Sequence, residues 1–164
     1  MVIELVYIAK GYMEALGFQV RSGFVNDIDR LKCGKVDHLE TVATFHVPDQ
    51  PGAVTNQNDP INAFYGQPFI YYSRVVEKML NTPHHPQLLY GQSIILHECV
   101  HYLQPHIHGH SKSVRYSDPK QYARQPDEHE AYLIQAIYYF NLTTVPVQLS
   151  QREKLVDYFI DYKK

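Results

Sequence analysis

The chain lacks tryptophan, and its 164 residues include only two cysteines, Cys33 and Cys99. Two cysteines cannot form the dense disulfide framework of a small secreted scaffold, and a chain of this length can bury a core without one. We therefore expect both thiols to be reduced and structural, as in a cytoplasmic protein.

A charge excess of either sign and a long apolar run are also missing. The chain has 15 Lys and Arg against 17 Asp and Glu, so no basic face is implied and a nucleic acid is not an expected partner. No segment approaches the roughly 18 apolar residues that a membrane-spanning helix needs. The first residues resemble an amphipathic helix rather than a signal peptide. We expect a cytoplasmic protein without a membrane partner.

Internal repeats, low-complexity tracts and breaks in composition are absent from the sequence. Hydrophobic residues make up 45% of the chain and charged residues 20%, which is an ordinary globular balance. These features predict one domain over residues 1–164.

The spacing of apolar residues predicts mainly helices and a few strands, an α+β class. Gly17 ends the first helical pattern, Ser73 and Ser150 are candidate N-caps, and Pro126 suits a first helical position. The predicted helices are 2–16, 74–80, 87–104, 126–141 and 150–163. The predicted strands are 18–25, 41–47 and 69–72, the last as an edge strand.

The stretch His97-Glu98-Cys99-Val100-His101 lies inside the predicted helix 87–104. Residues four apart share one helix face, so the two imidazoles can bind one Zn²⁺. Glu98 lies beside that face, where its carboxylate can take a proton from a metal-activated water. The flanking apolar residues predict a buried helix rather than a solvated one.

A catalytic zinc site needs a third protein ligand. The extended HExxHxxGxxH pattern is excluded, because Gln104 and Ile107 occupy its glycine and third-histidine positions. The helix that begins at Pro126 offers Glu128 or Glu130, and the residues alone leave this choice open.

The segments HECVHYLQ and PDEHEAYLIQA resemble the short gluzincins, in which HExxH is followed by a Glu in an E-x-E-A helix. The resemblance covers residues 69–141. It implies a small zincin-like domain, with a short sheet packed on the active-site helix and C-terminal helices. It also implies that His97, His101 and Glu128 hold one Zn²⁺, with Glu98 as the catalytic residue.

Tyr132 departs from the gluzincin pattern, because an acidic residue often stands at this position to support a ligand histidine. A phenol can hydrogen-bond such a partner but brings no charge. Glu128, Ala131, Tyr132 and Gln135 form one helical stripe, which we expect to face the metal. Glu130 is the second choice of ligand, followed by His129 or a loop histidine.

Two functions follow as hypotheses. The first is a zinc-dependent peptidase, an endopeptidase acting on a peptide or protein substrate. The second is a regulatory or structural zinc protein with a degenerate peptidase site, in which a histidine from the loop 106–110 would close the zinc sphere.

Several other residues are weaker candidates. His106, His108 and His110 form a His-rich loop that we interpret as lacking a function, although His108 or His110 could donate to a transition state. Tyr116 and Tyr122 are possible oxyanion donors by position. The strand 69–72 could hold a peptide by strand addition, or be an ordinary core strand.

Overall fold

A computed structural model describes residues 1–37, 39, 41–46, 68–109, 116–142 and 152–162. The chain is mixed α+β, mostly helical with a small sheet. In chain order the elements are α1 (Val2–Ala15), η1 (Ser22–Phe24), α2 (Val25–Ile28), β1 (Lys32–Lys35), β2 (Ala43–His46), β3 (Phe69–Tyr72), α3 (Arg74–Leu80), α4 (His85–Leu103), α5 (Pro105–His108), α6 (Pro119–Ala123), α7 (Pro126–Leu142) and α8 (Arg152–Tyr162).

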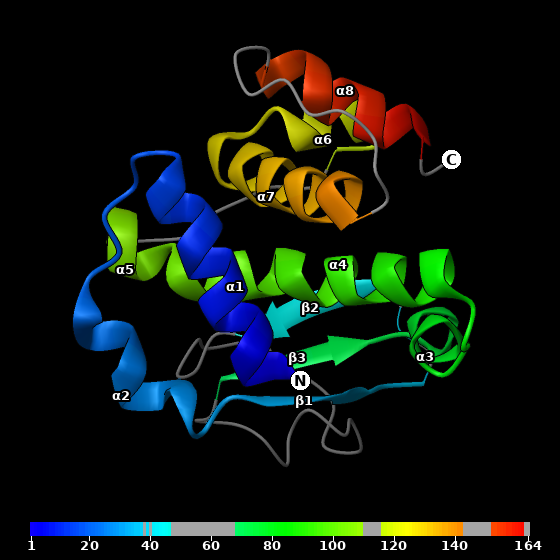
Figure 1. Cartoon of the computed structure of the whole chain (residues 1–164), viewed down its shortest axis with the longest axis horizontal. Helices are drawn as coiled ribbons and strands as arrows, with labels where there is room; N and C mark the ends of the chain where they lie inside the picture. The colour runs from blue at the N-terminus through cyan, green and yellow to red at the C-terminus, as the bar shows by residue number, and fades with distance from the viewer. Residues whose placement is uncertain (38, 40, 47–67, 110–115, 143–151, 163–164) are drawn as a thin grey trace.

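Helix α4 is the central element of the molecule. Figure 1 shows it running lengthwise between the sheet and α7, with α1 crossing it and α8 beyond α7. Residues 93–100 are all buried, because α4 has neighbours on every side. This confirms the predicted burial of the helix that carries the HExxH stretch, and its polar residues must therefore find partners inside the protein.

The sheet has the order β1-β3-β2 within the described residues. Strand β3 pairs in parallel with β1, and Ile70 lies opposite Cys33 in this pairing. Strand β3 also pairs antiparallel with β2, where Ile70 lies opposite Phe45. Residues 69–72 are thus a central strand, and their prediction as an edge strand is wrong. The error arises because β1, with the sequence Lys-Cys-Gly-Lys, has little of the β-branched or aromatic character that indicates a strand.

Residues 18–25 do not form the predicted strand. Gly17 has a φ of 96°, and the Phe18 amide donates to the Met13 carbonyl at 3.0 Å, so α1 ends in a left-handed turn that redirects the chain. The Arg21 amide then donates to the His106 carbonyl at 2.9 Å. The segment consequently bonds to the two helices α1 and α5 instead of to a strand.

The other predicted elements are found close to their expected bounds. Strand β2 lies within 41–47, and α1, α3, α4, α7 and α8 match the predicted helices. Ser73 is the N-cap of α3, although its side chain makes no capping hydrogen bond. Ser150 lies outside the described residues. Short helices α5 and α6 occupy parts of the segment 105–125, for which the sequence predicted no helix or strand.

Helix α7 separates two groups of buried apolar residues. One group lies among α1, the sheet and α4, and the other among α6, α7 and α8. Figure 1 shows the corresponding layers, with α6 and α8 on the side of α7 away from α4. In the described ranges, no helix is both long and apolar enough to cross a membrane.

Gly91 allows α3 and α4 to approach closely. A Cβ at this position would lie 2.9 Å from the Cβ of Met79 and 3.3 Å from Cδ2 of Leu80. We expect Gly91→Ala to force the helices apart and to lower the free energy of unfolding by about 1–3 kcal/mol. Urea denaturation monitored by circular dichroism measures this loss.

Gly11→Ala is the matched control, because nothing lies within 4 Å of a Cβ at Gly11. We expect Gly11→Ala to raise the free energy of unfolding by about 0.5–1 kcal/mol, because alanine is the better helix former. Equal effects of the two substitutions would contradict the close approach at Gly91.

Candidate metal centre

Three buried side chains from two helices converge between α4 and α7. His97 and His101 lie one turn apart on α4, and Glu128 lies in the first turn of α7. The His97 Nε2 is 3.2 Å from Glu128 Oε2, and the His101 Nε2 is 3.0 Å from Glu128 Oε1. One ligand atom from each residue lies within 4.8 Å of the others, so the three could share one metal ion.

The start of α7 places Glu128 between the histidines. The side-chain amide of Gln104, at the end of α4, donates to the Asp127 carbonyl at 2.7 Å. The Tyr122 hydroxyl, from α6, donates to Glu128 Oε1 at 2.9 Å. Glu128 is only 2% exposed, so Tyr122 and the two histidines, rather than water, hold its carboxylate.

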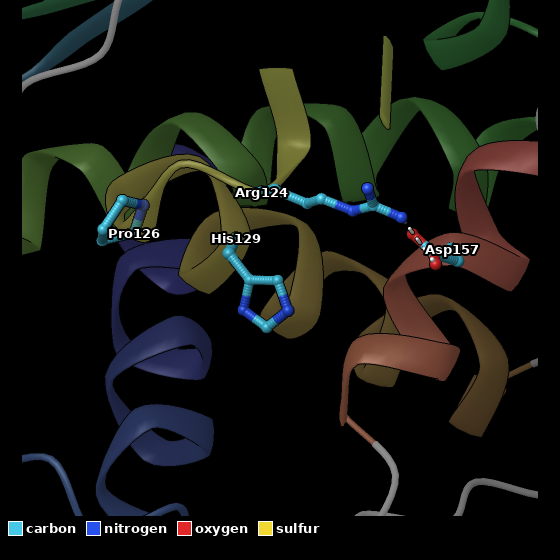
Figure 2. Close-up of a pocket in the computed structure, with 4 residues that line it drawn as sticks. All are labelled: Arg124, Pro126, His129 and Asp157. Carbon is cyan, nitrogen blue, oxygen red and sulfur yellow. Dashed lines mark ion pairs between the residues drawn. The ribbon is translucent and has the colours of Figure 1, made fainter. Parts of the chain in front are cut away.

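The other candidates for a third ligand point elsewhere. Both carboxylate oxygens of Glu130 contact His108 Nε2, at 2.9 and 3.0 Å. His129 lines a recess with Arg124, Pro126 and Asp157, where Arg124 pairs with Asp157 at 3.5 Å (Figure 2). Successive residues on a helix turn by about 100°, which explains why only Glu128 of the three faces His97 and His101.

Glu98 is buried beside the cluster, on the side of β2. The backbone amide of Phe45 in β2 donates a hydrogen bond to its carboxylate. Burial raises the pKa of Glu98, while the nearby charges of His97 and His101 oppose that rise. A carboxyl group with a raised pKa takes up a proton more readily than one in water, as a general base does.

His97 is supported by two further residues of the predicted stripe on α7. The Gln135 Oε1 lies 3.0 Å from His97 Nδ1, and the Gln135 amide donates to Ser93 Oγ at 3.2 Å. The Tyr132 ring packs against the His97 ring, with centroids 4.5 Å apart. Burial and the charge of Glu128 raise the pKa of Tyr132, which keeps its hydroxyl protonated.

The helical stripe predicted from the sequence includes Gln135, but the sequence indicated no role for it. Its position seven residues after Glu128, two helical turns away, is the signal that could have identified it. Gln104 contacts the second histidine, its Oε1 lying 2.7 Å from His101 Nδ1. Gln104 is the C-cap residue of α4, and no motif indicated its role.

The histidines of the loop 106–110 and the two candidate tyrosines, Tyr116 and Tyr122, lie in different environments. His106 lies near Gly23 and the Tyr102 ring, away from the cluster. His108 pairs with Glu130, and His110 lies outside the described residues. Tyr116 is exposed, so of the two candidate tyrosines only Tyr122 contacts the cluster.

Cys33 and Cys99 are both free thiols in the structure. Burial raises the pKa of each, to about 12 for Cys33. The Cys99 side chain is completely buried and faces the backbone of α1, with Sγ 3.9 Å from the Val2 carbonyl oxygen. Neither thiol is among the groups that could hold the metal.

Comparison of the chain with protein-family models, curated proteins and solved structures found no match in any of the three. The chemistry of the cluster must therefore be argued from its own geometry.

Protons would compete with a metal ion for the same atoms of this cluster. Burial lowers the pKa of His101, but the hydrogen bond to Glu128 and the charges of Glu98 and Glu128 outweigh it and raise the pKa to about 9. The pKa of Glu128 moves the other way: burial raises it, but hydrogen bonds from both histidines hold it well below its usual range. In protein stripped of metal, Nε2 of His101 is therefore protonated at neutral pH.

We expect zinc affinity to increase about tenfold per pH unit between pH 7 and about 9 and then to level off. Zinc must displace the proton from His101, and each unit rise in pH lowers the competing proton concentration tenfold. Competition with a fluorescent chelator of known pH dependence measures the affinity. An affinity that stays flat over this range would show that His101 is not protonated where the metal binds.

Proposed function

We propose that the protein is a zinc-dependent peptidase with His97, His101 and Glu128 as metal ligands and Glu98 as the catalytic acid and base. The single observation that carries the proposal is the convergence of two imidazole Nε2 atoms on one buried carboxylate, with a second carboxylate beside them.

The donor set favours zinc. Two imidazole nitrogens and one carboxylate are the ligands of catalytic zinc in several hydrolases, where water takes the fourth position. Structural zinc sites are instead closed by four protein ligands, often thiolates. Cys99 lies between the histidines in sequence, but its side chain points to α1. The possible metal ligands are therefore two imidazole nitrogens and one carboxylate oxygen.

Zinc held there would supply a Lewis acid for the scissile carbonyl and lower the pKa of the attacking water. Glu98 takes the proton of that water and passes it to the leaving amine nitrogen. The Phe45 amide fixes the carboxylate while this transfer takes place. Tyr122, whose hydroxyl already reaches the cluster, is the better of the two tyrosine candidates for an oxyanion donor.

The proposal extends to the architecture and to the substrate. We place the chain in a zincin-like arrangement, in which a short sheet packs on the active-site helix, and α4 does contact β2 and β3. A peptide or protein substrate would add as a strand at β2, because β3 is already paired on both sides. The two free thiols support a cytoplasmic location.

A zinc protein without catalytic activity is the second candidate. The uncharged Gln135 and Tyr132 around His97 favour it, because the Nδ1 of that imidazole faces an amide oxygen rather than a carboxylate. It requires a fourth protein ligand in place of water. His106 and His108 contact other groups, which favours the peptidase.

Glu98→Gln tests the catalytic role. We expect the variant to retain one zinc per chain and to lose about 10²- to 10⁴-fold in kcat/KM, because it removes the proton carrier but no ligand. Zinc is counted by elemental analysis after metal-replete purification, and cleavage is followed with a fluorogenic peptide library. Glu4→Gln, which removes an exposed carboxylate from α1, is the matched control.

Each outcome addresses a different part of the proposal. Wild-type protein that carries no zinc would overturn the whole proposal. Zinc-loaded protein with equal cleavage in wild type and Glu98→Gln would reject the role of Glu98. Zinc-loaded wild-type protein that cleaves nothing would favour the non-catalytic candidate.

A further inference from the structure

We propose that Gln104 and Gln135 are positioning residues that keep a proton on Nδ1 of both histidines and so direct each Nε2 to the metal. The inference rests on the proposed ligand set. It concerns how the chain fixes the two imidazoles, each of which could otherwise bind a metal through either nitrogen.

Gln104 has a fixed orientation because its amide group meets two acceptors. Its Nε2 lies 2.7 Å from the Asp127 carbonyl oxygen and 3.1 Å from Glu130 Oε1, and neither group can donate. Rotating the amide by half a turn would place its oxygen against these two oxygens. Its Oε1 must therefore face His101, and Nδ1 of that histidine must be the donor.

Gln135 is oriented through a serine hydroxyl. The Ser93 Oγ donates to the Tyr90 carbonyl at 2.6 Å, which commits the only hydroxyl proton. The same oxygen can then only accept, and it accepts from Nε2 of Gln135 at 3.2 Å. The Gln135 Oε1 is left for His97, so the Nδ1 of His97 must also be a donor.

The two glutamines thus have the same function, but different groups orient their amides. Both are buried, with 0% exposure for Gln104 and 3% for Gln135, so water does not compete for their hydrogen bonds. A partner of this kind fixes ring orientation as well as the position of the proton, and its loss in other zinc sites costs about 10–100-fold in metal affinity. Because both glutamine amides are uncharged, the negative charge of the site comes from Glu98 and Glu128.

Methionine substitutions test the assignment, because methionine keeps the length of glutamine and removes its hydrogen bonds. We expect Gln104→Met and Gln135→Met each to weaken Zn²⁺ binding about 10–100-fold, measured by chelator competition. Gln135→Glu keeps an acceptor oxygen for His97, and we expect its affinity to equal or exceed that of the wild type. Gln92→Met is the matched control, since Gln92 is on α4 and contacts Tyr138 instead of the cluster.

A spectroscopic readout separates positioning from general damage. With Co²⁺ in the site, each Nδ1 proton gives a paramagnetically shifted proton resonance that exchanges with solvent. We expect two such resonances in the wild type, Gln135→Glu and Gln92→Met. In each methionine variant, we expect one resonance to broaden or disappear through faster exchange.

The outcomes distinguish this inference from the proposed function. Wild-type protein that binds neither Zn²⁺ nor Co²⁺ would overturn the proposed function. Wild-type binding with unchanged affinity and both resonances in the methionine variants would overturn the inference alone. If a methionine variant does not fold, the Gln135→Glu variant tests the inference. Tenfold weaker zinc binding in this variant, together with loss of the His97 Nδ1 proton resonance, would show that an acceptor oxygen at this position does not fix the histidine.

Discussion

The burial of one carboxylate between two helices is the constraint on which the rest of the site depends. Glu128 is 2% exposed and loses nearly all of its hydration, so folding requires partners for it. His97, His101 and Tyr122 meet that requirement from α4 and α6. Removing one partner of a buried ion pair costs about 3–5 kcal/mol, which is a large part of the stability of a small domain. The packing of α7 on α4 thus includes these polar contacts as well as apolar ones.

Local patterns predicted the longer helices and the shared face of the two histidines, whereas the choice of Glu128 over Glu130 came from the resemblance to the short gluzincins. Four-residue spacing placed His97 and His101 on one face, and the start of a helix at Pro126 brought Glu128 into a first turn. The helical spacing and the helix start depend only on neighbouring residues in the chain, so the sequence alone was enough to predict them. The metal and the reaction remain proposals, because the same residues also form a self-consistent cluster of hydrogen bonds and ion pairs.

Features that depend on distant partners could not be predicted. Strand β1 exists because Lys32–Lys35 pairs with β3, and its own residues give little indication of a strand. Without β1, β3 looked like an edge strand. Gln104 presents the same difficulty at the level of one side chain. In the sequence it is an ordinary polar residue near a helix end, and its role depends on Asp127 and Glu130, which α7 brings to it.

The charge of the Glu128 carboxylate can be balanced by more than one occupant of the cluster. The carboxylate of Glu128 can be neutralised by a protonated His101 or by a dication, and both act at the same Nε2 atom. The bond from Nδ1 of His101 to Gln104 is common to the two states. A metal ion that takes the place of protons at the two Nε2 atoms would therefore satisfy Glu128 from the same positions on α4. Zinc fingers, in contrast, fold only when the metal binds. A site carried by two packed helices can be complete before the metal arrives, which is the preorganisation that catalysis requires.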